Sequence, residues 1–302
     1  MRYLIWVVVL FFLTGCKNEV REDKRQPLIV VTTSLLADAV KNIVGDSIAV
    51  ESLMGPGVDP HLYKASLGDL NKLMEADLVL YQGLYLEGKL GEVLEKLGRT
   101  NEVAGLANQL PDRLIKKVDD QGKIPDPHIW FDVAVWKEVV IHTNDVLAKQ
   151  FPASSVYFKT NTDIYLSKLD SLDRYIRTEI STIPVEKRVL ITSHDAFNYF
   201  GEAYDIEVKG LQGISTLSEF GLRDVSDLVK MISQRAIKAV FVETSVSPRS
   251  LNAVVAGVRD QGREVVIGGT LFTDALGEPD SEQGTYIGMM KYNADVIVKG
   301  LR

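Results

Sequence analysis

Three of the four histidines stand in similar short phrases, and an aspartate follows in a comparable position. His61 lies in GVDPHLY, His128 in PDPHIWFD and His194 in ITSHDAFNYF, and the three are almost evenly spaced along the chain. Asp274 follows after a slightly longer interval, in LFTDALG. Any one of these histidines alone would more often be structural. Their shared placement shortly after apolar, strand-like runs predicts one metal site assembled from distant loops.

Three neutral imidazoles and one carboxylate form a nitrogen and oxygen ligand set for a divalent transition metal. Zinc accepts this set in tetrahedral geometry, and a bidentate Asp274 would raise the coordination number. Manganese prefers more oxygen ligands, and it stands below zinc in the general order of affinities. The fourth histidine, His142 in VVIHTNDVL, lies within an expected helix, so we interpret it as a packing or surface residue.

Three further carboxylates could balance the positive charge of a bound metal from behind its ligands. The candidates are Glu243, at the end of an expected strand, and Asp59 and Asp195, each within two residues of a candidate histidine. The alternative for each residue is an ordinary solvated acid or a helix cap. The sequence leaves both interpretations open.

The elements that must position these residues alternate between strand and helix. In the first half we expect strands at Leu28–Thr32, Ser47–Met54 and Leu78–Tyr81, and helices at Ser34–Val44, Ser66–Ala76 and Leu86–Leu97. Ser34 and Ser66 stand where they could cap their helices. This order predicts an α/β fold with a mostly parallel sheet covered by helices.

The second half has the same architecture without a clear sequence repeat. We expect strands at Arg188–Thr192, Ile206–Val208, Ala239–Val242 and Glu264–Ile267, and helices at Val225–Ala236, Ser250–Gln261 and Tyr286–Leu301. Ligands of open parallel sheets bind beyond the carboxyl ends of strands. His61 and His194 follow expected strands, and Asp274 is expected after a turn at Gly268 and Gly269.

A long amphipathic stretch, Val156–Ile183, separates the two halves. Its apolar residues recur at steps of three and four, which places them on one helical face: Tyr165, Leu169, Leu172, Ile176, Ile180 and Ile183. Pro184 ends the pattern. A helix of about 28 residues would be about 42 Å long. It could brace two lobes, although an ordinary surface helix has the same periodicity.

The opening segment of the chain, MRYLIWVVVLFFLTGC, is typical of a bacterial lipoprotein precursor. Its apolar run is shorter than the roughly 20 residues that cross a bilayer, and its length suits a signal peptide. The end of the segment, LTGC, resembles a lipobox, in which cleavage leaves a lipid-carrying Cys16 at the N-terminus. The alternative is a buried N-terminal helix with a chance cysteine.

These features divide the chain into five predicted segments. They are a signal peptide at 1–15, a lipidated Cys16 with a flexible tether at 16–27, an α/β lobe at 28–154, a linking helix at 155–183 and a second α/β lobe at 184–302. The chain that follows the tether is long enough for two domains of ordinary size.

Composition and motifs exclude several other classes of protein. The formal net charge is −7, or −8 without residues 1–15 and their single arginine, and no basic stripe favours nucleic-acid binding. Cys16 is the only cysteine, so neither an internal disulfide nor a thiolate ligand is expected. The sequence lacks a Gly-x-x-x-x-Gly-Lys-Ser/Thr loop, so any ATPase must be a partner.

Taken together, the phrases resemble the metal-binding lipoproteins that serve bacterial ABC importers of zinc and manganese, the cluster A-I or TroA-like solute-binding family. The resemblance covers nearly the whole mature chain. It rests on the segments GVDPHLYKASLGDLNKLMEADLVLYQGLYLE, DPHIWFD, ITSHDAFNYFG, KGLQGISTLSEF, VFVETSVSPRS, IGGTLFTDALGE and GTYIGMMKYNADVIVKGL.

The resemblance implies two α/β lobes joined by one long rigid helix, and metal ligation by His61, His128, His194 and Asp274. Manganese-selective members often have Glu at the third ligand position, where this chain has His194. Dedicated zinc members often carry a His/Asp-rich loop after the first ligand, which this chain lacks. Zn²⁺ and Mn²⁺ therefore both remain candidate ligands.

The resemblance also implies partners and a location. It predicts a monomeric binding protein, not an enzyme, that captures a metal and delivers it to an ABC permease and its ATPase. The protein would be lipid-anchored at the periplasmic or extracytoplasmic face of a bacterial membrane.

Two other functions compete with this prediction. A zinc-dependent hydrolase needs an open metal position and a placed general base. The sequence has no His-Glu-x-x-His motif, and four protein ligands would fill a tetrahedral site. An adhesion-type surface lipoprotein is the second alternative, since some relatives were described as adhesins, but an adhesive surface has no readable signature here.

Overall fold

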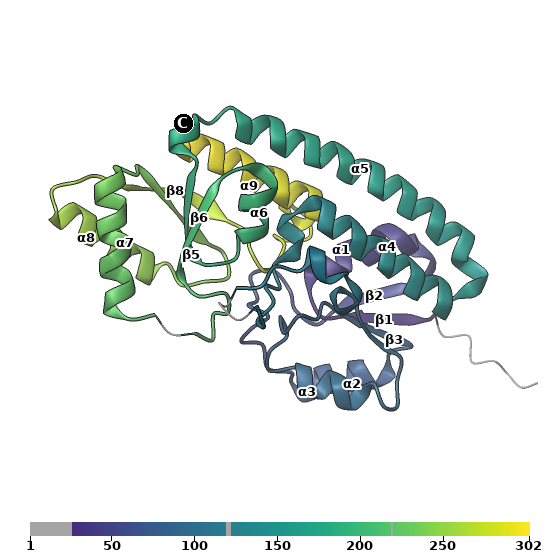
Figure 1. Ribbon diagram of the computed structural model, residues 1–302. Helices are drawn as coiled ribbons and strands as arrows, with labels where there is room; N and C mark the ends of the chain where they lie inside the picture. The colour runs from purple at the N-terminus through teal and green to yellow at the C-terminus, as the bar shows by residue number, and fades with distance from the viewer. Residues whose placement is uncertain (1–25, 119–121, 219) are drawn as a thin grey trace, which may run out of the picture.

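Two four-stranded parallel sheets form the framework of the computed structural model, which describes residues 26–118, 122–218 and 220–302 (Figure 1). The strand orders are β2-β1-β3-β4 and β6-β5-β7-β8. All the registered strand pairs of both sheets are parallel. The predicted α/β class with two lobes and a long linking helix is confirmed. The predicted signal peptide and the predicted lipidation site Cys16 lie outside the described residues.

The first lobe is a sheet with helices on both faces. Its strands are β1 (Leu28–Val31), β2 (Ala49–Ser52), β3 (Leu78–Tyr81) and β4 (Val103–Gly105), and its helices are α1 (Ser34–Val44), α2 (Leu67–Glu75), α3 (Gly91–Leu97) and α4 (Val133–Gln150). Alternate residues of β1 point to opposite faces, because Ile29 and Val31 pack with α1 and α4 while Val30 packs with α2 and α3.

The second lobe repeats this arrangement. Its strands are β5 (Val189–His194), β6 (Glu207–Gln212), β7 (Ala239–Glu243) and β8 (Val266–Leu271), and its helices are α6 (Asn198–Tyr204), α7 (Leu222–Arg235), α8 (Arg249–Asp260) and α9 (Tyr286–Leu301). Leu190 packs with α6 and α9, whereas Ile191 packs with α7 and α8. Burial on both faces explains the apolar sequences of the central strands β5 and β7, whereas the edge strands β6 and β8 are largely exposed or half-buried.

Helix α5 (Ser155–Ser181) runs along both lobes and joins them (Figure 1). Its buried residues follow the predicted face: Phe158, Thr162, Tyr165, Leu169, Leu172, Ile176 and Ile180. The apolar ones belong to one hydrophobic cluster that also contains residues of α1, α4, α6 and α9. The two lobes therefore share a continuous core alongside α5. Within the described ranges, no helix is long and apolar enough to cross a bilayer.

Two local predictions in the first lobe are wrong. Ser34 does not cap α1: the Thr33 hydroxyl accepts the Leu36 N–H at 3.3 Å, and the Ser34 hydroxyl instead accepts the Leu276 N–H at 2.9 Å. Helix α3 begins at Gly91 rather than at residue 86. The preceding turn takes Leu84 and Tyr85 through positive φ angles of 53° and 64°, which an α-helix cannot contain.

The predicted turn at Gly268 and Gly269 is also wrong, because both glycines are needed for close packing within a strand. Gly268 and Gly269 do not form a turn but lie inside β8. A Cβ atom on Gly269 would lie 2.4 Å from Val296 Cγ1 of α9, and one on Gly268 would lie 2.9 Å from the Phe241 ring. The glycines let the strand approach its neighbours closely. The short strand β4 was not predicted at all.

Candidate metal centre

The four candidate ligands converge from both lobes. His194 is the last residue of β5, and Asp274 follows shortly after the end of β8. His61 lies in the loop after β2, which turns at Gly57 with a φ of 67°. His128 precedes the short 3-10 helix at 129–131 that leads into α4. All four side chains are buried, with exposed fractions of 0–1%.

One ligand atom from each of the four side chains lies within 4.8 Å of all the others. His128 Nε2 lies 3.3 Å from His61 Nε2 and 3.4 Å from His194 Nε2. Asp274 approaches through Oδ1, 3.5 Å from His128 Nε2, and through Oδ2, 3.7 Å from His194 Nε2. Atoms that each bond one ion at about 2 Å have separations of this size.

Buried carboxylates fix two of the imidazole rings. Asp126 Oδ1 accepts from both His128 N and His128 Nδ1, at 3.0 and 2.8 Å. Glu243 accepts the His194 N–H at 2.8 Å through Oε1 and pairs with His194 Nδ1 through Oε2. With one proton held at Nδ1, each neutral ring can present the Nε2 lone pair to a metal ion, which is the usual arrangement behind a metal-bound histidine.

The Asp274 carboxylate has one oxygen held and the other free. Its Oδ2 accepts from the Ser245 hydroxyl at 3.0 Å. Its Oδ1 is buried and receives no hydrogen bond from the residues that the structure describes. An unsatisfied buried carboxylate oxygen is costly unless a cation compensates it. The donor chemistry therefore fits a divalent metal.

In the metal-free site, burial and neighbouring charges shift the pKa values of His61 and His194 in opposite directions. Burial lowers the pKa of His61 to about 3, although Asp274 opposes it. Burial also lowers the pKa of His194, but the carboxylates of Glu243 and Asp274 outweigh it and raise that pKa to about 9. Asp274 is equally buried, yet the neighbouring histidines hold its pKa below the usual range, so it remains ionised.

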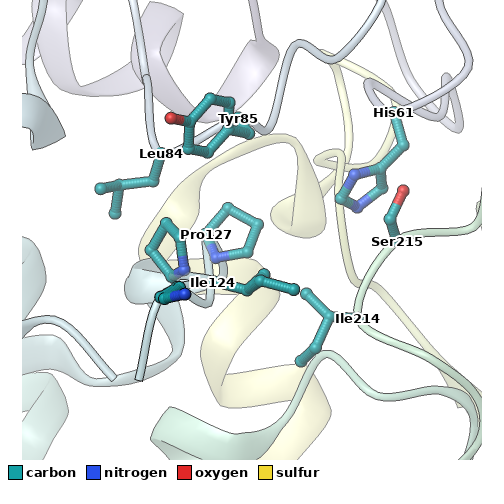
Figure 2. A pocket seen from close by; sticks show the side chains of 9 residues that line it. His61, Leu84, Tyr85, Ile124, Pro127, Ile214 and Ser215 are labelled. Atoms are coloured by element: carbon teal, nitrogen blue, oxygen red, sulfur yellow. The ribbon is translucent and has the colours of Figure 1, made fainter. Parts of the chain in front are cut away.

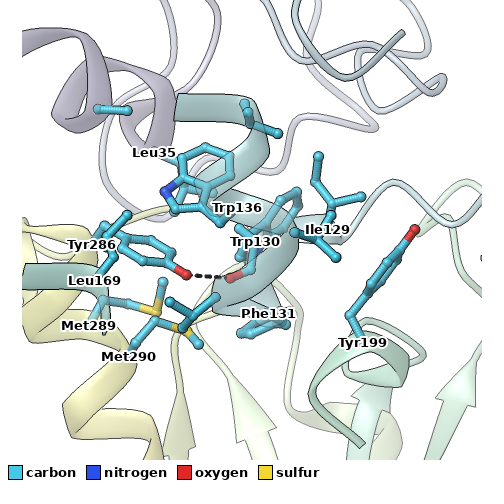
Figure 3. Close-up of a cluster of buried hydrophobic side chains, with 14 of the residues drawn as sticks. Leu35, Ile129, Trp130, Phe131, Trp136, Leu169, Tyr199, Tyr286, Met289 and Met290 are labelled. Carbon is cyan, nitrogen blue, oxygen red and sulfur yellow. Dashed lines mark hydrogen bonds between the residues drawn. The ribbon is translucent and has the colours of Figure 1, made fainter. Parts of the chain in front are cut away.

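The segment that carries His128 is anchored to the second lobe. Trp130 Nε1 donates to the Thr273 carbonyl at 3.0 Å, next to Asp274. The Tyr286 hydroxyl of α9 donates to the Trp130 carbonyl at 2.7 Å, the dashed line in Figure 3. Trp130 and Tyr286 are fully buried. This packing fixes His128 relative to Asp274 although they are distant in sequence.

A cavity of about 310 Å³ adjoins the site at His61 (Figure 2). Of the four candidate ligands, His61 alone lines it. The other lining residues include Tyr85 and Pro127 and, from the second lobe, Ile214 and Ser215. His61 is therefore the candidate ligand nearest to the cavity, and His128, His194 and Asp274 do not line it.

Two of the three other predicted carboxylates, Glu243 and Asp59, contact a candidate ligand. Glu243 contacts His194, and Asp59 Oδ1 accepts the His61 backbone N–H at 2.8 Å. Asp195 is tied to Asn198 and has no recorded hydrogen bond to a candidate ligand within the described chain. His142 lies half-buried within α4, as its sequence context predicts.

Sequence reasoning missed Asp126, although a signal was present. The tripeptide Asp-Pro-His occurs twice, at 59–61 and at 126–128. In both copies the aspartate accepts the backbone N–H of its histidine. The repeated phrase therefore marks a turn that orients a histidine, and it could have identified both aspartates.

The chain is similar to one protein-family model and to several metal-binding proteins of bacteria. The family model described as the periplasmic zinc-uptake complex component A matches residues 29–300. The manganese-binding lipoprotein MntA of Bacillus subtilis is 47% identical over 308 residues, covering 100% of both chains. The metal ABC transporter substrate-binding lipoprotein SloC of Streptococcus mutans is 30% identical, covering 99% of this chain and 97% of that protein.

One relative combines sequence and structural similarity. The zinc-binding protein TroA of Treponema pallidum is 42% identical, covering 95% of this chain and 92% of that protein. Its solved structure matches with a TM-score of 0.89 at 43% identity, covering 92% of this chain and 99% of that one.

Proposed function

Since the chain belongs to the family of the periplasmic zinc-uptake complex component A, we propose that His61, His128, His194 and Asp274 together bind one zinc or manganese ion as transported cargo. The protein is the substrate-binding component of a metal ABC transporter, as its relative SloC is. The observation that carries the site assignment is the convergence of the four buried ligand atoms within 4.8 Å.

Zinc should bind more tightly than manganese. Three imidazole nitrogens and one carboxylate suit zinc, whereas manganese prefers more oxygen ligands, and the general affinity order places zinc above manganese for such sites. The relatives named above include one manganese-binding and one zinc-binding protein. Which ion is imported therefore depends on availability as well as affinity.

The site serves binding rather than catalysis. Four protein ligands fill a tetrahedral zinc shell, whereas catalytic zinc keeps a position for water. The carboxylates of Asp126 and Glu243 are engaged with the His128 and His194 rings. Neither carboxylate is therefore placed to act as the general base of a hydrolase.

We assign the remaining features to the same role. Cys16 would carry the lipid that anchors the mature protein at the outer face of a bacterial membrane, and residues 17–27 would form the tether. A permease and its ATPase, both separate chains, would receive the ion. The binding protein itself would act as a monomer.

Competitive titration of the purified protein with zinc and manganese tests the proposal. We expect one ion per chain and tighter binding of zinc. His128→Ala should weaken zinc binding at least about a hundredfold, because it removes the ligand nearest to the other two histidines. His142→Ala is the matched control and should leave the affinity unchanged. Equal losses in both variants would show that the wrong histidines are assigned.

A further inference from the structure

The Asp59 carboxylate connects a candidate ligand of the first lobe to a loop of the second lobe. Its Oδ1 accepts the His61 N–H at 2.8 Å, and its Oδ2 accepts the Thr216 hydroxyl at 2.6 Å. We propose that the Thr216–Asp59 hydrogen bond is a latch that holds His61 in the site and slows metal release. This inference rests on the proposed metal-binding function.

The loop that carries Thr216 is built to reach across the two lobes. It comprises residues 213–218 and follows β6. Gln212 Nε2 donates to the carbonyls of Thr216 and Ser218, at 2.8 and 2.7 Å, and so folds the loop back on the end of its strand. The loop thus presents the Thr216 hydroxyl as a fixed donor rather than as a flexible one.

A second contact of the same loop lies beside the hydrogen bond. A Cβ atom placed on Gly88 would lie 3.4 Å from Leu217 Cδ1 and 3.5 Å from the His61 carbonyl oxygen. Leu217 therefore covers the first lobe next to His61. Ser215 and His61 line the same end of the cavity in Figure 2. The loop thus forms one wall of the cavity beside His61.

The two Asp-Pro-His turns differ in a way that singles out His61. Asp126 holds both the backbone and the ring of His128, whereas the recorded bonds of Asp59 go to the His61 backbone and to Thr216. His194 is held by Glu243 in the same double manner as His128. Both turns contact the second lobe, but of the three candidate histidines only the His61 ring has no carboxylate partner among the described residues, and its turn is tied to the second lobe through Asp59.

This difference predicts where metal release begins. His128 and His194 have buried carboxylate partners, and only His61 lines the cavity. Dissociation should therefore start with movement of the 59–61 turn away from the ion. That movement must break the Thr216–Asp59 bond, a charge-assisted hydrogen bond whose loss should speed release about tenfold.

The test measures zinc dissociation after mixing the loaded protein with excess chelator. Thr216→Val keeps the shape of the side chain and removes the hydroxyl, and should release zinc about tenfold faster. Thr216→Ser keeps the hydroxyl and should remain within about twofold of the wild type. Adding Thr216→Val to Asp59→Ala should change the rate no further, because Thr216 acts through Asp59.

A second readout reports the latch without metal. Hydrogen exchange of the His61 amide in the metal-free protein should be faster in Thr216→Val, since that amide donates to Asp59. The latch would be overturned if Thr216→Val released zinc and exchanged the His61 amide at the wild-type rates. It would also be overturned if adding Thr216→Val to Asp59→Ala sped zinc release tenfold. If the wild-type protein bound neither zinc nor manganese, the proposed function would be contradicted instead. Hydrogen exchange of the His61 amide would still test the latch in that case.

Discussion

At the scale of single residues, the site is a set of ligands together with the carboxylates that orient them. Asp126 and Glu243 add two buried negative charges behind a carboxylate ligand, so a divalent ion would be more than neutralised. The oriented rings should make the site rigid before the metal arrives, because the Nδ1 atoms of His128 and His194 are already engaged.

We predict that Asp126→Asn weakens zinc binding about ten- to a hundredfold, because an amide orients the His128 ring less strongly than a carboxylate and removes a compensating charge. Asp195→Asn is the control, since Asp195 is a nearby acid that makes no hydrogen bond to a candidate ligand among the described residues. Its affinity should stay within about twofold of the wild type. Calorimetric titration of both variants checks this, and equal losses would argue against a specific role for Asp126.

Metal binding should release a proton near neutral pH. The raised pKa of His194, about 9, means that the metal-free protein carries a proton on His194 below that pH. His61, with its lowered pKa of about 3, carries none. A metal ion must displace the His194 proton, so zinc affinity should rise about tenfold per pH unit from about pH 7 towards pH 9 and then level off. An affinity that is constant across this interval would refute the assignment of His194.

The candidate ligands were predictable from sequence, but their supports were only partly so. Histidine is rare in this chain, so three similar phrases stand out. The acids that support them are harder to identify from sequence, because many other carboxylates occur at helix caps and on solvated faces. Glu243 reaches His194 from the neighbouring strand β7, whereas among the described residues no hydrogen bond joins Asp195 to a candidate ligand, so its predicted role stays a prediction.

At the scale of elements, most strands and helices were predictable because their patterns are long or bounded. Strand β3 and helix α9 occupy their predicted residues, whereas the very short β4 carries almost no periodic signal. The failures occur where packing overrides local propensity, as at Gly268 and Gly269, and where a turn competes with a helix, as at Leu84 and Tyr85.

The close approach of β8 to α9 yields a test of stability. Gly269→Ala would place Cβ 2.4 Å from Val296 Cγ1, so we expect the free energy of unfolding to fall by about 1–3 kcal/mol. Gly91→Ala is the control, because a Cβ atom there meets nothing within 4 Å at the start of α3. It should stabilise the protein by up to about 1 kcal/mol. Denaturant unfolding of the metal-free proteins measures both changes, and an unaffected Gly269→Ala would show that α9 yields easily.

At the scale of the whole molecule, the shared core limits how the site can open. One hydrophobic cluster includes Leu36 of α1, Leu169 of α5 and Ile297 of α9, so it runs through both lobes. Wide separation of the lobes would expose this cluster to water. Local movement of the His61 turn and of the loop 213–218 requires no such exposure, which makes it the cheaper route for metal to leave.

The central claim is that one ion sits between the lobes and is bound by four named side chains. Anomalous diffraction at the zinc absorption edge from crystals of the loaded protein tests it most directly. We predict a single strong peak, about 2.0–2.2 Å from the Nε2 atoms of His61, His128 and His194 and from a carboxylate oxygen of Asp274. A principal peak elsewhere, or one bound by His142 or by surface carboxylates, would contradict the account.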